Sequence, residues 1–386
     1  MKKIKWDFDT ILNDRNVLVD MANNEEDVVK KYQLMSVISF LDNYHFINLS
    51  KAKAPKQDLH SRLYYTASER VGYQSAYFLV HQFYNDLLAL QPLFDDNKKL
   101  LGKVLGSEAD FTNKLGLHIS NKQAFAAVES FYNSFDSELL EYFYPTFLEK
   151  DKQVRFVKDN NTKGADSESD GFCFFVGGLN KNYISVNNEK SPSKAYNLIH
   201  EFGHSIANLI NPFYCYQERT TFFGEVQSMF PELVAMYENP LGLPEIENLH
   251  LLYCNLLANY QNANYLVMHD LIINEWEDNK YRINIPLYFR LKRKYNIDKY
   301  ELYNSLSKSI TDSGEYILSF AVCCELLYIY KQDKAKALKL FKQILNISSY
   351  GNELSQVLSI ININEHTLDI SQDICEKLNL ALRKMW

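Results

Sequence analysis

One pentapeptide determines how the rest of this chain is interpreted: His200-Glu201-Phe202-Gly203-His204, an H-E-x-x-H motif. In an α-helix, side chains four positions apart differ in direction by about 40°, so both imidazoles leave one face and can bind the same ion. Glu201 lies one step around the helix, where its carboxylate can take a proton from an attacking water but is poorly placed as a ligand. Zinc-dependent hydrolysis requires this division between ligands and base. The motif therefore predicts one Zn²⁺ per chain, with Glu201 as the general base.

The segments on either side of the motif predict the local structure that it needs. Ser191-Pro192-Ser193 is a helix start signal and Asn211-Pro212 is a stop signal, so the motif falls inside a helix that ends at residue 210. Before this helix, two β-prone runs at residues 172–176 and 183–186 flank a Gly-Gly pair, which predicts a β-hairpin. A hairpin followed by an H-E-x-x-H helix is typical of zinc endopeptidases.

A third ligand must come from another segment, because a catalytic zinc site uses three protein ligands and one open position. The downstream candidates are Glu218, Glu225, Glu232 and His250. A second helix is predicted over residues 224–238, and Glu225 stands 21 residues after His204, which leaves room for a loop and an antiparallel first turn. The spacing favours Glu225 without excluding the other three.

The rest of the 386-residue chain is predicted to be mainly α-helical, because glycine (13) and proline (9) are scarce and apolar side chains recur at helical spacing. Amphipathic helices are predicted over residues 25–41 and 73–90. The segment after residue 240 is predicted as nearly continuous helix, with polar breaks near residues 278, 312 and 348–352. We expect two parts, which are an N-terminal helical region over residues 1–130 and a catalytic domain over residues 131–386.

Composition and charge exclude several classes of protein. The chain carries 41 Lys and Arg against 48 Asp and Glu, a net charge of −7 without a basic stripe, so nucleic acids and anionic membranes are not expected partners. No apolar stretch reaches the ~20 residues of a membrane span, and residues 1–9 lack the apolar core of a signal peptide. The six cysteines show no C-x-x-C spacing, which together with the absent signal predicts reduced, buried thiols in a cytoplasmic protein.

Several motifs occur in an order that is similar to one peptidase family. They are the Gly177-Gly178 pair, the strand at residues 183–187, the H-E-F-G-H helix, and E-V-Q-S-M-F-P-E at residues 225–232. This order resembles the oligoendopeptidase F and thimet oligopeptidase family of zinc metallopeptidases, sharply over residues 164–232 and more loosely over residues 131–369. The resemblance implies a mainly α fold with a thermolysin-like (gluzincin) core, a small β-hairpin, and an N-terminal helical region that forms one wall of a substrate cleft.

The resemblance also implies roles for further residues. It makes Glu225 the third zinc ligand, and it makes Glu232 a group that supports the ligands from outside the coordination sphere. Tyr316 corresponds to the tyrosines of a late family helix that hydrogen-bond the substrate and the developing oxyanion. The strand at residues 183–187 is expected to lie along the cleft and to pair with an extended peptide. The substrate-binding residues implied in this way are Gly177, Gly178, Tyr183 and Ser185.

The resulting hypothesis is a zinc metalloendopeptidase that hydrolyses short or unstructured oligopeptides of roughly 6–20 residues. Two departures from the family keep alternatives open. The N-terminal part is shorter than in typical members, which suits a peptidase dedicated to processing one precursor. No histidine lies between His269 and His366, where members usually have one, which suits a zinc-holding peptide-binding protein of weak activity.

Overall fold

A computed structural model of the chain describes residues 8–27, 73–105, 118–157, 171–176, 180–188, 190–211, 222–282, 310–347, 353–363 and 365–385, with isolated positions between 30 and 70 and between 289 and 293. The fold is mainly α-helical with one small sheet, as predicted. The elements are α1 (Phe8–Asn24), α4 (Tyr77–Leu88), α5 (Gln91–Leu105), α7 (Asn121–Phe135), η2 (Ser137–Leu139), α8 (Leu140–Leu148), α9 (Lys150–Gln153), β1 (Val154–Val157), β2 (Gly171–Val176), β3 (Lys181–Asn187), α10 (Ser193–Ile210), α11 (Val226–Glu238), α12 (Glu245–Asp278), α15 (Ile310–Gln332), α16 (Lys334–Leu345), α17 (Glu353–Ile360) and α18 (Thr367–Met385).

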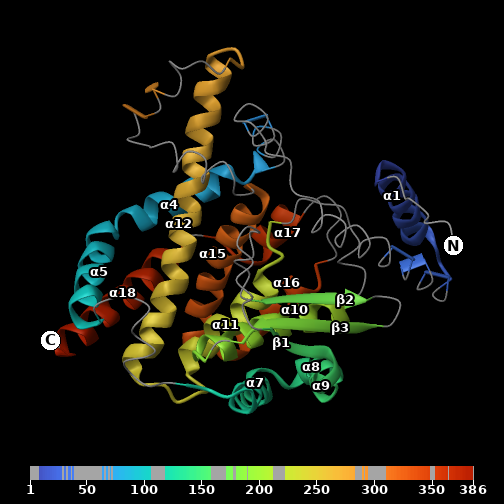
Figure 1. Ribbon diagram of the computed structural model, residues 1–386, viewed down its shortest axis with the longest axis horizontal. Helices are drawn as coiled ribbons and strands as arrows, with labels where there is room; N and C mark the ends of the chain where they lie inside the picture. Colours follow the sequence, from blue (N-terminus) through green and yellow to red (C-terminus); the bar gives the residue numbers. More distant parts are fainter. Residues whose placement is uncertain are drawn as a thin grey trace.

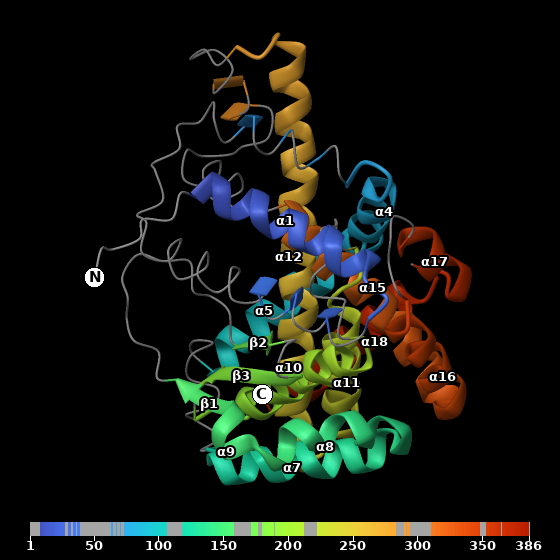
Figure 2. The same ribbon diagram turned by 90° about the vertical axis from the view of Figure 1, so that its right-hand side faces the viewer.

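Helix α10, which carries the H-E-x-x-H motif, is packed on several sides. It contacts β2 and β3 of the sheet, crosses α11, and packs on α7 and α8 (Figure 1). The long helix α12 runs beside α15 and α18 and also contacts α4, while α18 packs on α5 (Figures 1 and 2). Most of these helices contribute to one hydrophobic core. The motif helix is therefore held between a sheet and a helical body.

Aromatic side chains fix the orientation of α10. Phe202 of the motif is fully buried, and its ring centroid lies 5.1 Å from that of Phe143 and 5.9 Å from that of Phe147. The Tyr132 hydroxyl donates a hydrogen bond to the Ile199 carbonyl at 2.7 Å. These contacts turn the opposite face of α10, with both motif histidines, toward α11.

The sheet confirms the predicted hairpin and adds a strand that the sequence did not reveal. β2 and β3 pair antiparallel, with Gly171 opposite Val186 and Val176 opposite Lys181. β1 pairs parallel to β3 over its four residues, so the strand order is β1-β3-β2. The prediction that residues 183–187 pair with a peptide is corrected by this order, because strands already flank β3 on both sides. Of the described strands, β1 and β2 lie at the edges of the sheet, and β2 is the edge strand that contacts the motif helix.

Three helix boundaries also differ from the prediction. Residues 25–27 are not helical, since α1 ends at Asn24, and helix occurs only at described positions from 30 onward. Within residues 73–90, α4 covers only Tyr77–Leu88. The break predicted near residue 312 is wrong, because Asp312 lies inside α15. Gly314 is accommodated in that helix because the Tyr73 ring fills the space of its missing side chain, with Cδ1 only 2.9 Å from where a Cβ would stand. The break near residue 278 is confirmed, and residues 348–352 lie outside the described part.

The remaining expectations concern the cysteines, membrane-spanning helices and the division of the chain into two parts. No disulfide joins the described cysteines; Cys323, Cys324 and Cys375 are buried as predicted, whereas Cys254 is exposed. None of the described helices combines the length and apolar character that crossing a bilayer requires. The division into two parts stays a prediction, and its boundary after residue 130 falls within α7.

Candidate metal centre

The centre is built at the crossing of α10 and α11. Only a glycine allows this crossing, because a Cβ on Gly203 would stand 2.7 Å from the Ser228 Cα atom and closer still to the Gln227 carbonyl oxygen. Pro231, inside α11, has no N–H to donate to that same carbonyl four residues earlier. The backbone of Gln227 thus faces Gly203 directly, and the first turn of α11 lies against the motif.

Three potential ligand atoms converge at this crossing. Glu225 immediately precedes α11, and its Oε2 atom lies 3.2 Å from His200 Nε2 and 3.3 Å from His204 Nε2. One ligand atom from each of these residues lies within 4.8 Å of the other two. Two imidazole nitrogens and one carboxylate oxygen are a donor set that catalytic zinc sites use. The arrangement therefore fits a zinc ion with three protein ligands.

The outer nitrogens of both imidazoles also have partners. His200 donates from Nδ1 to Glu232 Oε2 at 2.8 Å, and His204 Nδ1 lies 2.9 Å from the side-chain amide of Gln227. The Ser228 hydroxyl lies 3.0 Å from Glu225 Oε2 and holds that carboxylate in turn. Ligating histidines in metal sites almost always have such a partner on the second nitrogen, which fixes the ring orientation.

The electrostatics of the centre follow from this clustering of imidazoles and carboxylates. Burial alone would lower the pKa of His200, but hydrogen bonds to Glu225 and Glu232 outweigh burial and raise its pKa well above the ordinary value. Burial alone would raise the pKa of Glu225, but the charge of His204 and the hydrogen bond from His200 hold its pKa well below the ordinary value. Positive charge is therefore favoured between these side chains, which is the condition for holding a cation.

Glu201 lies beside the ligand cluster without joining it. The residue is 4% exposed, and its Oε2 atom has no hydrogen-bond partner among the described residues. Burial raises the pKa of this carboxyl, although the two histidines partly oppose the shift. Gly171 at the start of β2 leaves it room, since a Cβ there would stand 2.7 Å from Glu201 Oε1. A buried carboxylate with one unpartnered oxygen, next to a candidate cation site, is suited to accept a proton.

Tyr316 of α15 belongs to the same surroundings. Burial raises the pKa of its hydroxyl, and the charges of Glu225 and Glu201 add to the rise, so the phenol stays protonated. The residue as a whole is 38% exposed. Two later tyrosines are engaged elsewhere, because Tyr328 stacks on His366 and Tyr330 donates to Glu238. Of the tyrosines in α15, Tyr316 is the one whose pKa is raised by the carboxylates of Glu225 and Glu201.

The remaining candidates divide into three groups. His250 does not join the cluster, since its Nε2 atom lies 3.5 Å from the Cys254 sulfur. Tyr183 and Ser185 lie on the central strand β3. Glu218, Gly177 and Gly178 lie outside the described residues. Sequence reasoning missed Gln227 and Gly171, and the only signal for Gln227 was its place two residues after Glu225, inside the motif that starts α11.

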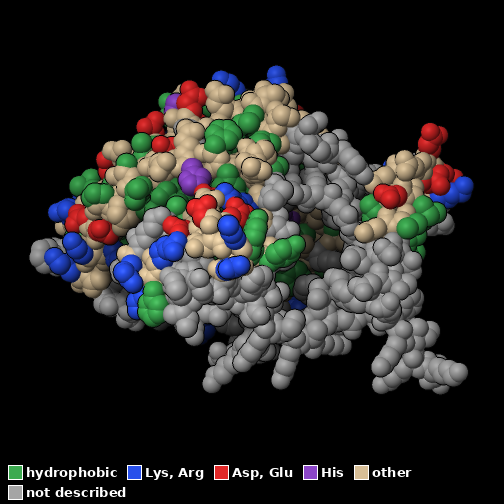
Figure 3. All heavy atoms as spheres, turned by 90° about the horizontal axis from the view of Figure 1, so that it is seen from above, with side chains coloured by type: hydrophobic (Ala, Val, Ile, Leu, Met, Phe, Trp, Pro, Cys, Tyr) green, Lys and Arg blue, Asp and Glu red, His purple; other side chains and the backbone are tan. Residues whose placement is uncertain are grey.

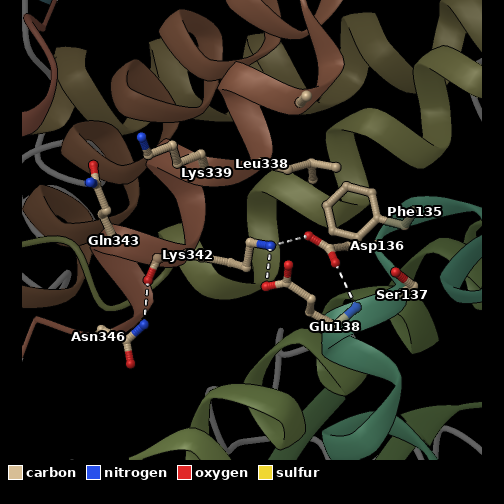
Figure 4. A pocket seen from close by; sticks show the side chains of 10 residues that line it. Phe135, Asp136, Ser137, Glu138, Leu338, Lys339, Lys342, Gln343 and Asn346 are labelled. Atoms are coloured by element: carbon tan, nitrogen blue, oxygen red, sulfur yellow. Dashed lines mark hydrogen bonds and ion pairs between the residues drawn. The ribbon is translucent and has the colours of Figure 1, made fainter.

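The described surface away from the centre offers a contrast. A pocket of about 870 Å³ opens between the end of α7, η2 and α16, and none of its lining residues belongs to the histidine–glutamate centre. Its Lys342 points to Asp136 and Glu138, with Nζ–oxygen distances of 3.0 and 2.6 Å (Figure 4). Figure 3, which views the molecule from above, shows side chains of both charges interspersed over the described part of the face that it draws. The candidate chemistry is therefore at the α10–α11 crossing.

Comparison with known proteins gives a consistent fold. No protein-family model and no curated sequence matches the chain. Solved structures do: a candidate peptidase from Chlamydophila abortus (11% identity, 96% of this chain and 67% of that one, TM-score 0.56) and a candidate oligoendopeptidase F from Bacillus anthracis (12%, 94% and 64%, 0.51). A third is PZ peptidase A bound to an inhibitor (12%, 98% and 78%, 0.58). The predicted resemblance to the oligoendopeptidase family is confirmed at the level of the fold, and the chain spans 64 to 78% of the length of these proteins.

Proposed function

We propose that this chain is a zinc-dependent peptidase that cleaves short or unstructured peptides. The observation that carries the proposal is the convergence of His200 Nε2, His204 Nε2 and Glu225 Oε2 next to the buried carboxylate of Glu201. The shared fold with structures called peptidases supports the same class of reaction. In this proposal His200, His204 and Glu225 hold one Zn²⁺, while Glu232 and Gln227 hold the histidine rings.

Glu201 has the role of general base and then of general acid. When bound, zinc supplies Lewis-acid polarisation of the scissile carbonyl and activation of water. Glu201 accepts a proton from the attacking water as the new C–O bond forms, and it returns that proton to the amine nitrogen as the C–N bond breaks. Its orphaned Oε2 atom leaves a lone pair available for this transfer. Because burial already raises its pKa, the carboxylate is a better proton acceptor than an exposed one.

Tyr316 is proposed as a hydrogen-bond donor to the oxyanion that develops on the scissile carbonyl. The hydroxyl must be protonated to donate, and burial together with the carboxylates of Glu225 and Glu201 keeps it so. Removing one such donor costs enzymes about 10²–10³ in kcat. This role would replace the missing late histidine that the sequence analysis identified.

The open edge of β2 is the proposed platform for the peptide backbone. An extended peptide can add to a free strand edge through main-chain hydrogen bonds, and folded proteins do not offer such a segment. β2 begins at Gly171, which lies directly over Glu201, so a peptide paired there would pass the proposed base. Phe172 of this strand is exposed and can contact substrate side chains. This platform takes over the role that the sequence analysis gave to β3.

Metal content and peptide hydrolysis, measured on the same preparations, test the proposal. We expect about one zinc per wild-type chain, loss of zinc in His200→Ala, His204→Ala and Glu225→Ala, and unchanged zinc in the exposed-site control His118→Ala. Glu201→Gln should keep its zinc and lose at least ~10²-fold in turnover of a mixed peptide substrate.

Each assignment can fail separately. Full zinc in Glu225→Ala with an empty site in Glu232→Ala would exchange the roles of these two residues. Zinc and peptide binding without turnover by the wild-type protein would favour the peptide-binding alternative over an enzyme. Turnover of Glu201→Gln within a few-fold of wild type would refute its role as base.

A further inference from the structure

The two motif histidines are held by chemically different partners. His200 donates from Nδ1 to a carboxylate, Glu232 Oε2, at 2.8 Å. His204 Nδ1 instead lies 2.9 Å from Gln227 Nε2, the amino end of a side-chain amide. A carboxylate can only accept a hydrogen bond, whereas an amide presents a donor at one end and an acceptor at the other. The partner of His204 can therefore serve either tautomer of the ring.

The amino end of the amide, Gln227 Nε2, is the atom that faces His204 Nδ1, while His204 Nε2 lies 3.3 Å from Glu225 Oε2. A histidine that binds a metal through Nε2 carries its hydrogen on Nδ1 and requires an acceptor there. A half-turn of the Gln227 amide brings Oε1 to face Nδ1 and supplies that acceptor.

We propose that Gln227 is a positioning residue for His204. Its side-chain amide holds the ring at Nδ1 and, turned so that Oε1 faces that nitrogen, accepts the Nδ1 hydrogen while Nε2 binds the ion. This inference rests on the proposed zinc site. The ring is thereby kept in the orientation that directs Nε2 toward Glu225.

The backbone around Gln227 is placed to make this possible. Its carbonyl lies against Gly203, the residue directly before His204, and Pro231 removes the helical N–H that would otherwise bond to that carbonyl. The main chain of Gln227 is thus fixed next to the ring that its amide serves. A glutamate at this position would also accept from Nδ1, but it would place one more negative charge in a centre that already holds Glu201, Glu225 and Glu232.

Zinc affinity of the whole 386-residue chain, measured by competition with a chelating dye, tests the inference without relying on activity. Gln227→Leu keeps the approximate size of the side chain and removes both amide groups, and we expect it to weaken zinc binding about 10- to 100-fold. Gln227→Glu keeps an acceptor and should bind zinc within about tenfold of wild type, or more tightly. Gln372→Leu, an exposed glutamine on α18, is the control and should bind as wild type does. Co²⁺ absorption, which reports ligand geometry, should change only in Gln227→Leu.

The outcomes separate this inference from the proposed function. Absence of zinc binding by the wild-type protein would refute the proposed function. Normal zinc binding by wild type and by Gln227→Leu, within about twofold and with the same Co²⁺ spectrum, would refute the role of Gln227 while leaving the site standing. Should Gln227→Leu fail to fold by circular dichroism, Gln227→Glu decides, since an equally severe loss of zinc in a folded glutamate variant would contradict the acceptor role.

Discussion

Replacing Gly203 by alanine should damage stability and metal binding together. The added methyl group would stand 2.7 Å from the Ser228 Cα atom, where ordinary van der Waals contact begins at 3.4 Å. The distance is 3.4 − 2.7 = 0.7 Å too short for ordinary contact. Because the clashing atoms belong to the backbone, no change of side-chain rotamer can relieve the clash. Helix α11 must therefore move away from α10, and Glu225 at its start must move with it.

The magnitude follows from two opposing effects. Alanine is favoured over glycine in a helix by about 1 kcal/mol, whereas overpacking a core costs about 1–3 kcal/mol. We expect a net loss of up to about 2 kcal/mol in the free energy of unfolding. Ligand positions in a metal site are tolerated within about 0.2 Å, so a shift of 0.7 Å should also weaken zinc binding by at least about tenfold.

Thermal unfolding and dye competition for zinc measure the two effects. Gly102→Ala is the matched control, because this helical glycine in α5 has nothing within 4 Å of a built Cβ. That substitution should stabilise the protein by about 0.5–1 kcal/mol and leave zinc affinity unchanged. If Gly203→Ala unfolded at or above the wild-type temperature and bound zinc equally well, the close crossing would not be what sets the site.

Two further predictions concern single side chains. Tyr316→Phe should keep its zinc and lose about 10²-fold in peptide turnover if the hydroxyl donates to the oxyanion; turnover within about threefold of wild type would contradict this. Burial lowers the pKa of His269 to about 4, below the ordinary ~6.5. The neutral imidazole therefore makes its full contribution to the free energy of unfolding above pH ~6.5, and this contribution is lost as pH falls toward 4. In unfolding experiments at pH 7 and 4.5, His269→Leu should reduce the loss of stability between the two pH values by up to about 3 kcal/mol. The exposed-site control His118→Leu should not reduce it. An unchanged pH dependence in His269→Leu would refute the role of His269 in acid unfolding.

The sequence predicted those features that depend on local patterns. The motif helix, the β2–β3 hairpin and the start of α11 near Glu225 all have short-range signals in capping residues, alternation and spacing. β1 has four residues and gains its identity only by pairing with β3, so its sequence carries too little pattern to reveal it. Asp312 and Gly314 resemble a helix break, and the helix continues because a distant ring, that of Tyr73, packs against the glycine. Such tertiary contacts have no local signature.

The candidate site followed the same division. H-E-x-x-H indicated two of the proposed ligands, because the relevant geometry is that of one helix, while the spacing only favoured Glu225 and the family resemblance singled it out. The partner of His204 could not be recognised in this way, since which residue near Glu225 faces the ring depends on how the two helices cross. Gln227 became identifiable only when its amide was found 2.9 Å from Nδ1.

One helix crossing therefore connects the stability of this fold to its chemistry. α10 supplies His200, Glu201 and His204, and an eight-residue stretch from residue 225 to residue 232 supplies Glu225 and both imidazole partners. The rest of the core supports the site by packing against these two segments. Phe230, for example, packs on Phe341 with their ring centroids 4.9 Å apart. Substitutions that separate α10 from α11 should reduce stability and metal affinity in proportion. Substitutions between α5 and α18, whose main contacts are with each other and, for α18, with α12, α15 and α4, should change stability alone.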